Sequence, residues 1–246
     1  IISEVSKMDA ELFANMLSDK SILDLKKLRY RYPQADMKEF VALLGNGFYK
    51  KLPLKDFDGR NLVYLESIAQ VHLTAVKVLL TPQNSKQLYG MKAMEEEILS
   101  TFTIEQIATT RDSVHKILSG YAPTTESENR IYGMKKGLEF IGDPRHKINE
   151  ENIHQLYAIA IGAFLPGENR LLAGYKYRHD SVYIVGNKVK HTGLPWQMLP
   201  EYMGNLVSFI NEASTINDLL KAAIIHFYIG YLHPWFDGNG RMARLL

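Results

Sequence analysis

One stretch near the end of the sequence decides how the chain is expected to fold: TINDLLKAAIIHFYIGYLHPWFDGNGRMARLL, residues 215–246. Its first four residues, 215–218, fit a capping box at the start of a helix. The positions that follow are apolar on nearly every side up to Leu232, which predicts a helix buried at the centre of a helical domain. Pro234 ends this helix, because proline cannot continue it, and leaves His233 at the C-terminal end.

The loop after this helix collects residues that suit the binding of a polyphosphate. Gly238 and Gly240 allow backbone conformations closed to other residues, so consecutive N–H groups can turn inward around an anion. A new helix is expected to begin at Arg241, and its N-terminus adds the positive end of a dipole. Arg241 and Arg244 lie three positions apart on one face, so both can reach a bound phosphate chain.

Three further residues give this loop its chemistry. Asn239 tolerates the left-handed backbone region and can form hydrogen bonds. Asp237 is placed to hold a divalent cation between phosphate oxygens. His233 can accept a proton near neutral pH. A base, a metal ligand, an anion-binding turn and two cations on one loop indicate nucleotidyl or phosphoryl transfer. The loop is not a Walker loop, because the sequence contains no G-x-x-x-x-G-K-[ST].

Residues 233–244, HPWFDGNGRMAR, resemble the signature of the Fic family, H-P-F-x-[DE]-G-N-G-R-x-x-R, with Trp235 in place of the phenylalanine. The resemblance implies the Fic helical core and the transfer of AMP from ATP to a Ser, Thr or Tyr hydroxyl of a target protein. It implies that His233 is the general base, that Asp237 binds Mg²⁺, and that the phosphates are held by Gly238, Asn239, Gly240, Arg241 and, at the γ-phosphate, Arg244. Glycine at 240 favours AMP transfer, because the phosphorylating branch of the family carries lysine there.

Residues 177–190 are the one convincing strand pair in the sequence, with β-branched and aromatic residues around the turn Gly186-Asn187. They resemble the hairpin that the family calls the flap. The resemblance implies that an extended segment of the target protein docks on it through backbone hydrogen bonds, which is β-augmentation. The resemblance covers roughly residues 149–246 and does not extend to the first 120 residues.

A second motif suggests regulation. Residues 124–129, TTESEN, fit the family's regulatory pattern [ST]-x-x-x-E-[GN]. The resemblance implies an inhibitory helix whose Glu128 pairs with Arg244 at the place that the γ-phosphate needs. A second interpretation stays open, because Thr125 and Glu128 also have the spacing of a capping box. A side chain that reaches Arg244 cannot cap its own helix.

The rest of the chain predicts helices separated by turns, including a long amphipathic helix at 62–80 and a clear break at 120–123. We expect a mainly α-helical protein: an N-terminal helical domain of unknown role at 1–120, the inhibitory helix at 121–142, and a Fic core at 143–246. The core is expected to carry the flap at about 177–190 and the active loop at 233–244. Residues beyond Leu246 are expected to complete the last helix.

Composition narrows the classes of partner. The 246 residues include 29 Lys and Arg against 27 Asp and Glu, and a net charge of +2 does not indicate a nucleic-acid binder. The sequence has no cysteine, which excludes disulfides, Cys-ligated metals and Cys nucleophiles. No apolar stretch is long enough to span a bilayer, so no membrane partner is expected. We expect a cytoplasmic location, and homo-oligomerisation is left open.

The resemblance to the Fic family thus implies a protein adenylyltransferase that depends on Mg²⁺ and ATP and is held inactive by Glu128. Two alternatives stay open. The chain could be a nucleotide-binding interaction module without transfer activity, or the same site could remove AMP from a modified protein.

Overall fold

The computed structural model describes residues 8–22, 24–65, 86–185, 189–212 and 216–246. Contacts between Cα atoms group the chain into two compact units. One unit comprises Ile1–Leu52 and Asn61–Gln70, and the other comprises Pro53–Arg60 and Val71–Leu246. The described part of the chain is mainly helical, with two small two-stranded sheets, as the sequence predicts.

The first unit begins with three short helices, α1 (Ala10–Leu17), α2 (Leu25–Arg31) and α3 (Met37–Gly47). Each starts at an aspartate whose carboxylate accepts hydrogen bonds from first-turn N–H groups, and these caps are Asp9, Asp24 and Asp36. Apolar side chains from the three helices form a small core around Met16, Leu28 and Phe40.

Strands β1 (Tyr49–Lys55) and β2 (Asn61–Leu65) follow and pair with each other. The helix predicted from residue 62 is wrong for residues 62–65, which form β2. The short apolar run of Leu62, Val63 and Tyr64 fits a strand as well as a helix, and pairing with β1 decides between them. Residues 66–80 of that predicted helix lie outside the described residues.

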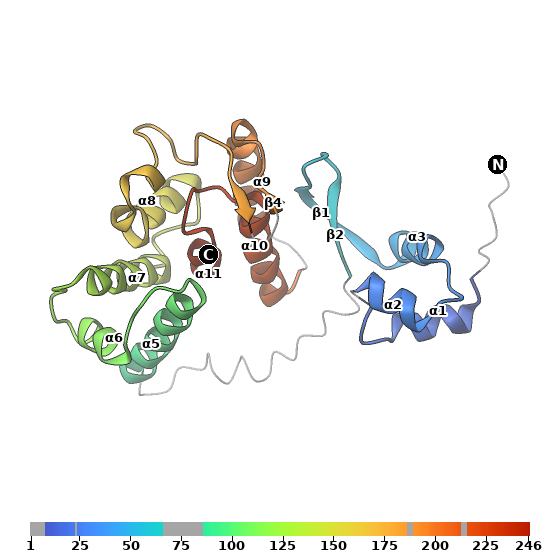
Figure 1. Cartoon of the computed structure of the whole chain (residues 1–246), viewed down its shortest axis with the longest axis horizontal. Helices are drawn as coiled ribbons and strands as arrows, with labels where there is room; N and C mark the ends of the chain where they lie inside the picture. Colours follow the sequence, from blue (N-terminus) through green and yellow to red (C-terminus); the bar gives the residue numbers. More distant parts are fainter. Residues whose placement is uncertain (1–7, 23, 66–85, 186–188, 213–215) are drawn as a thin grey trace. The chain divides into compact units, whose positions relative to one another are not determined.

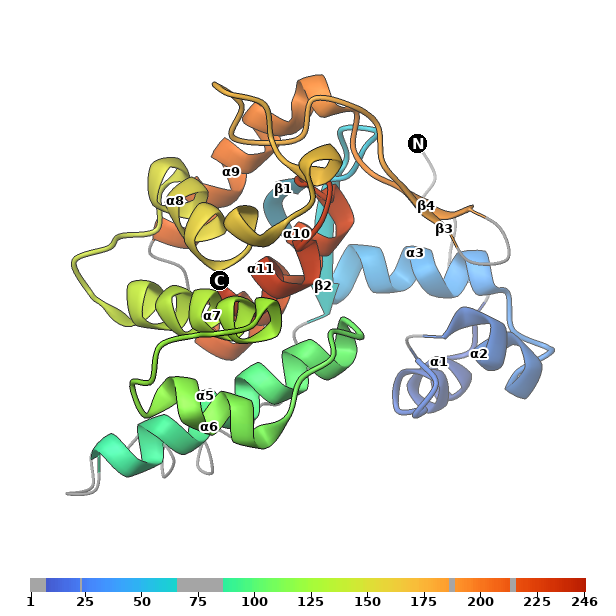
Figure 2. The same ribbon diagram turned by 60° about the vertical axis from the view of Figure 1, so that its left-hand side comes forward.

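The second unit contains seven helices in its described part (Figure 1): α5 (Lys86–Ile104), α6 (Arg111–Leu118), α7 (Glu126–Gly142), α8 (Glu150–Ala160), α9 (Leu199–Asn211), α10 (Asp218–Leu232) and α11 (Asn239–Leu245). The hairpin of β3 (Tyr183–Val185) and β4 (Val189–Thr192) lies between α8 and α9 in the sequence. Helix α7 packs against α5, α6, α8 and α11, while α11 also packs against α10 (Figure 2).

Two glycines in α7 permit its close packing on α8. A Cβ at Gly137 would lie 2.8 Å from the Cβ of Ala160, and one at Gly133 would overlap the ring of Phe164. The helix therefore tolerates two residues of low helix propensity because they allow α7 and its neighbours to approach closely.

Helix α10 departs from the prediction of a helix buried on every side. It buries Ile224, Ile225 and Ile229, but Phe227 is 55% exposed and His226 lies on the same exposed face. Its cap also differs, because Asn217 accepts the N–H of Leu219 at 3.0 Å. Thr215, the predicted cap, lies outside the described residues.

The predicted boundary near residue 120 falls between α6 and α7, inside the second unit. Helix α6 packs against both α5 and α7, so the three helices form one body with the C-terminal part of the chain. The division of the chain into an N-terminal domain, an inhibitory helix and a core stays a prediction about function.

Candidate functional site

His233 is the first residue after α10 and turns the chain out of the helix. Its backbone is left-handed, with φ 54°, and its N–H donates to the carbonyl of Ile229 at 2.9 Å. The ring nitrogen Nδ1 lies 3.4 Å from the carbonyl of Gly230. A carbonyl can only accept, so Nδ1 carries the proton and Nε2 keeps its lone pair. Burial lowers the pKa of His233, and the positive charge of Arg178 lowers it further. The imidazole is therefore a neutral base at pH 7.

Arg178 fixes the backbone of His233 and was assigned no role by the sequence analysis. It is 1% exposed, and Nε donates to the carbonyl of His233 at 2.7 Å. Its other nitrogens donate to the carbonyls of Asp180, at 2.6 Å, and Leu194. Its own N–H donates to the carbonyl of Pro234 at 2.9 Å. One guanidinium thus joins both ends of hairpin β3–β4 to the start of the active loop.

Trp235 anchors the loop in the core. It is fully buried, stacks on Tyr157 with 4.9 Å between ring centroids, and donates from Nε1 to the carbonyl of Lys176 at 3.2 Å. Asn239 bonds both backbone groups of Trp235: Oδ1 accepts its N–H at 2.9 Å, and Nδ2 donates to its carbonyl at 2.7 Å. The Asn239 side chain is therefore used within the loop, which leaves its backbone N–H for a ligand.

Gly238 has no substitute in this turn. Its φ is 83°, in the left-handed region, and a Cβ there would lie 2.6 Å from Cγ2 of Ile161. The first hydrogen bond of α11 runs from the N–H of Met242 to the carbonyl of Gly238 at 2.9 Å. The N–H groups of residues 239–241 precede this bond and have no acceptor within the helix. They are the donors that the sequence analysis expects to meet phosphate oxygens.

Asp237 and Arg241 form an ion pair on this turn, with 3.0 Å between Oδ1 and Nη2. The same Oδ1 also accepts the N–H of Gly238. Oδ2 has no hydrogen-bond partner among the described residues, and the side chain of Asp237 is 40% exposed. Arg241 is 5% exposed, and its Nε is buried without a partner. Both residues thus keep bonding capacity toward the place where a phosphate chain would lie.

Arg244 is bound by Glu105 and Thr101. Its Nη2 pairs with the Glu105 carboxylate, and its Nε donates to Oγ1 of Thr101 at 2.7 Å. Glu105 follows α5 directly, and Thr101 lies in the last turn of that helix. A Cβ at Gly240 would lie 2.5 Å from Oε1 of Glu105. The carboxylate therefore sits against the anion-binding turn.

The predicted pair of Glu128 and Arg244 does not form in this structure. The Glu128 carboxylate accepts from Nζ of Lys116 at 2.9 Å and from N and Oγ1 of Thr124, both at 2.7 Å. Its N–H donates to Oγ1 of Thr125 at 3.1 Å. Thr125 thus caps α7, as in the second interpretation of this motif, but the carboxylate bonds Thr124 and Lys116. The hydrogen bond from Lys116 is the main reason why the pKa of Glu128 falls to about 2.

A sequence signal for Glu105 exists but is incomplete. Thr101 and Glu105 have the spacing [ST]-x-x-x-E, but Gln106 follows where the family pattern has glycine or asparagine. The structure explains that preference, because Gln106 has φ 56° at the end of α5. Glycine and asparagine adopt this conformation with less strain. The motif at 124–129 matches the pattern completely, which is why Glu128 is the residue predicted from the sequence, whereas Glu105 is the glutamate paired with Arg244 in this structure.

The predicted β-hairpin is present, with shorter strands than expected. Tyr183 pairs with Thr192, and Ile184 pairs with His191. Tyr177 and Arg178 are buried below it, and Tyr177 donates from its hydroxyl to Glu150 at 3.3 Å. The turn Gly186-Asn187 lies outside the described residues.

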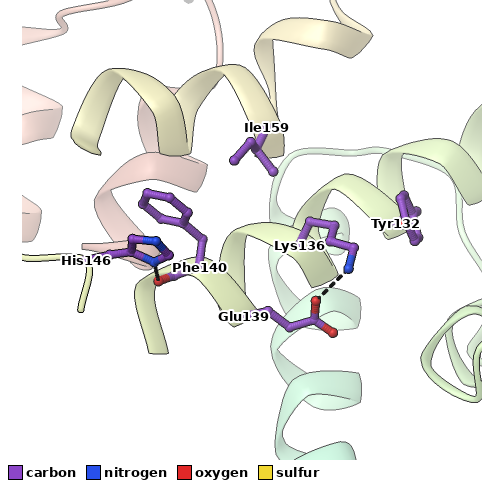
Figure 3. A pocket seen from close by; sticks show the side chains of 6 residues that line it. All are labelled: Tyr132, Lys136, Glu139, Phe140, His146 and Ile159. Carbon is purple, nitrogen blue, oxygen red and sulfur yellow. Dashed lines mark hydrogen bonds and ion pairs between the residues drawn. The ribbon is translucent and has the colours of Figure 1, made fainter. Parts of the chain in front are cut away.

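A pocket of about 500 Å³ opens elsewhere, beside α7, and is lined by Tyr132, Lys136, Glu139, Phe140, His146 and Ile159 (Figure 3). Its polar groups bind one another: Lys136 pairs with Glu139 at 3.0 Å, and His146 lies 2.9 Å from the carbonyl of Phe140. It contains no residue of the loop 233–244, so it is not the candidate site.

Comparison with known proteins finds similarity in the part of the chain that carries this loop. Residues 147–246 match the model of the Fic/DOC family. The matched residues are the C-terminal part of the chain and include the active loop. No helix among the described residues has the length and apolar character needed to cross a membrane.

The curated proteins that this chain resembles in sequence are named protein adenylyltransferases. Fic-1 of Caenorhabditis briggsae is 27% identical over 182 residues, which cover 71% of this chain and 33% of that protein. Fic of Drosophila melanogaster is 26% identical over 143 residues, which cover 57% of this chain and 28% of that protein. The chain thus spans about a third of the length of these relatives or less.

Solved structures show the same fold. A Fic family protein from Desulfovibrio desulfuricans superposes with a TM-score of 0.53 at 22% identity, covering 73% of this chain and 52% of that one. A Fic domain containing signaling protein from Bacteroides thetaiotaomicron superposes with a TM-score of 0.57 at 21% identity, covering 69% of this chain and 66% of that one. The observed helical architecture is thus the Fic fold.

Proposed function

We propose that this chain is a protein adenylyltransferase, which transfers AMP from ATP to a hydroxyl side chain of a target protein. The names of its relatives support this activity. The observation that carries it is the geometry of one loop: a half-buried histidine with a free Nε2 stands at one end, and a turn of unbonded N–H groups with two arginines at the other.

The proposed reaction uses these residues in sequence. Nε2 of His233 takes the proton of the target hydroxyl, and the oxygen attacks the α-phosphorus of ATP. The bond to the β-phosphate oxygen breaks, and pyrophosphate leaves. The N–H groups of residues 239–241 and the guanidinium of Arg241 stabilise the charge that develops on the phosphates. Because Arg178 fixes the backbone of His233, little reorganisation is required of the base.

Asp237 fits the binding of Mg²⁺. Mg²⁺ commonly binds through one carboxylate, substrate phosphates and water. Asp237 offers one oxygen without a protein partner, and no cluster of three candidate ligands occurs among the described residues. When bound, Mg²⁺ supplies charge neutralisation on the phosphates. Asp237 would hold it, while Arg241 keeps the carboxylate oriented.

We further propose that the structure represents an inhibited state in which Glu105, and not Glu128, is the inhibitory residue. The Glu105 carboxylate occupies the face of the turn beside Gly240 and engages Arg244, the residue expected at the γ-phosphate. Negative charge there repels the phosphate chain and withholds Arg244 from it. Activation then requires a population in which Glu105 has left this position.

Hairpin β3–β4 is the proposed docking site for the target. In the described part of the chain β3 and β4 form a sheet of two strands, so a strand edge is available for a further strand. Such pairing holds a target segment by its backbone and presents one side chain to His233. A cytoplasmic location stays a prediction.

The test is a labelling assay with α-labelled ATP, Mg²⁺ and candidate target proteins. Four proteins are compared: wild type, Glu105→Gly, Glu128→Gly and the double variant Glu105→Gly/His233→Ala. We expect label transfer to rise in Glu105→Gly, to match wild type in Glu128→Gly, and to vanish in Glu105→Gly combined with His233→Ala. Equal labelling by all variants would contradict the mechanism.

Two controls separate the alternatives. A target that is already modified and that loses AMP on incubation with the chain would indicate removal of AMP by the same site. The absence of ATP and ADP binding in calorimetry, even with Glu105→Gly, would favour an interaction module without nucleotide chemistry.

A further inference from the structure

The loop Pro53–Arg60, which we call the tyrosine-clamped loop, is bound by three tyrosines of α9 and α10. The hydroxyl of Tyr228 donates to the carbonyl of Lys55 at 2.9 Å, and that of Tyr202 donates to the carbonyl of Asp56 at 3.0 Å. The hydroxyl of Tyr231 accepts the N–H of Phe57 at 3.3 Å. Backbone groups of three consecutive residues are thus held, whatever their side chains.

The loop is also ordered from within. Oδ1 of Asp56 accepts the N–H of Asp58 at 3.0 Å and that of Arg60 at 2.8 Å, while Oδ2 pairs with Nε of Arg60 at 2.9 Å. Gly59 supplies the positive φ, 78°, that closes the turn. A loop preorganised in this way can act as a rigid support, because little ordering entropy is lost when it binds.

Phe57 is the residue of this loop that contacts the surroundings of the candidate site. Its ring stacks on Tyr231 with 4.1 Å between centroids and lies 5.8 Å from the ring of His191. Nε2 of His191 is 2.7 Å from the carbonyl of Tyr231. Tyr231 precedes the base His233 by two residues, and His191 belongs to β4. Phe57 thus contacts both elements at the place where they meet.

An isolated two-stranded hairpin is marginally stable, so β3–β4 depends on outside contacts for its position. Arg178 holds its two ends, and His191 is the strand residue bonded to α10. We propose that the tyrosine-clamped loop is a positioning element of the AMP-transfer site. Phe57 holds Tyr231 and His191 together and so sets the place of hairpin β3–β4 relative to His233. The relevance of this contact to AMP transfer rests on the proposed function. The contact between Phe57 and the hairpin can be tested whether or not the chain transfers AMP.

The test is hydrogen exchange measured by mass spectrometry on the full chain. Wild type is compared with Phe57→Ala, with Phe57→Tyr as the conservative rescue, and with Tyr132→Ala as a half-exposed aromatic control on α7. We expect exchange in the peptides that cover β3 and β4 to rise about tenfold in Phe57→Ala, because a local contact is lost. Phe57→Tyr and Tyr132→Ala should leave the hairpin as in wild type.

Unchanged hairpin exchange in Phe57→Ala would overturn the inference, as would an equal rise in α7 and α8, since that indicates general destabilisation. ADP binding by calorimetry separates this result from the proposed function. With Glu105→Gly as background, Phe57→Ala should keep its ADP affinity within about twofold, because the ring contacts of Phe57 are with His191 and Tyr231, which lie outside the loop 233–244. The inference would also be overturned if Glu105→Gly bound ADP and the double variant Glu105→Gly/Phe57→Ala did not. No binding in either protein would refute the proposed function and leave the exchange result standing.

Discussion

Glu105 and Arg244 form an ion pair that joins the end of α5 to α11, the helix that follows the turn at Gly238. Both side chains are largely buried, at 23% and 17% exposure, and Thr101 adds a second bond to the guanidinium. The place of Arg244 is therefore tied to α5. Under the proposed inhibition by Glu105, the end of α5 must move before this arginine can meet a ligand.

The first prediction concerns nucleotide affinity. Glu105→Gln keeps the shape of the side chain but removes its charge, so Arg244 becomes free to meet a γ-phosphate. We expect ATP to bind about tenfold more tightly than to wild type, which corresponds to about 1.4 kcal/mol. ADP, which lacks the γ-phosphate, should gain less. Calorimetry with both nucleotides measures the difference.

The matched control is Glu128→Gln, which removes a carboxylate bonded to Lys116 and Thr124. It should leave both affinities unchanged. An equal gain in the two variants would show that general charge, and not the pair with Arg244, governs nucleotide binding.

The second prediction concerns stability. Arg178→Met leaves the carbonyls of Asp180, His233 and Leu194 without their donor, and the bond to Leu194 lies in the buried interior. Unpaired buried acceptors and a lost charge-assisted network are expected to lower the free energy of unfolding by about 3 kcal/mol. Urea unfolding followed by circular dichroism measures it. Arg170→Met is the control, because exposed Arg170 bonds the carbonyl of Leu165 at 2.7 Å and should lose about 1 kcal/mol or less.

The third prediction concerns the pH dependence of AMP transfer. The pKa of His233 is lowered from 6.5, chiefly by burial. The neutral imidazole is the active base, so activity is lost as the pH falls through the lowered pKa. The acid limb of kcat, measured with Glu105→Gly, should have its midpoint below pH 6.5. A midpoint above 6.5, or an NMR titration of His233 above that value, would refute this role for burial.

The same shift affects stability. Below pH 6.5 the unfolded chain binds a proton at His233 that the folded chain does not, so this residue destabilises the fold as the pH falls from 6.5 through the lowered pKa.

The fourth prediction concerns Glu128. Its pKa falls from 4.5 to about 2, so its carboxylate contributes stability above pH 4.5 that is lost progressively toward pH 2. Glu128→Gln should lower Tm at pH 7 and leave it nearly unchanged at pH 2. Calorimetric scans at both values test this. Glu126→Gln, in the same turn but with a 79% exposed side chain, should have little effect at either pH.

The fifth prediction concerns Gln106, the non-glycine residue with φ 56° after α5. Gln106→Gly removes the strain of a left-handed side-chain residue and should raise the free energy of unfolding by about 0.5–1 kcal/mol. Gln106→Ala keeps the strain and serves as the control. If both variants have the same stability in urea, backbone strain is not stored there.

Much of this protein was determined by local sequence alone. The turn at 238–240, the cap at Thr125, the end of α10 at Pro234 and the pairing of two β-branched segments follow from backbone chemistry within a few residues. Such preferences act over short range, and so the active loop could be predicted from its own residues.

Only the tertiary structure decided which groups meet across the chain. Whether Glu105 or Glu128 reaches Arg244 depends on how α5 and α7 pack on α11. The two glutamates lie in similar sequence motifs, so the sequence does not show which of them is close to Arg244 in space. Arg178 is an ordinary charged residue in the sequence and becomes the support of His233 through burial among carbonyls. Residues 62–65 become a strand because β1 offers free backbone partners. Each of these outcomes is set by the desolvation and pairing of groups distant in sequence, which local preference does not encode.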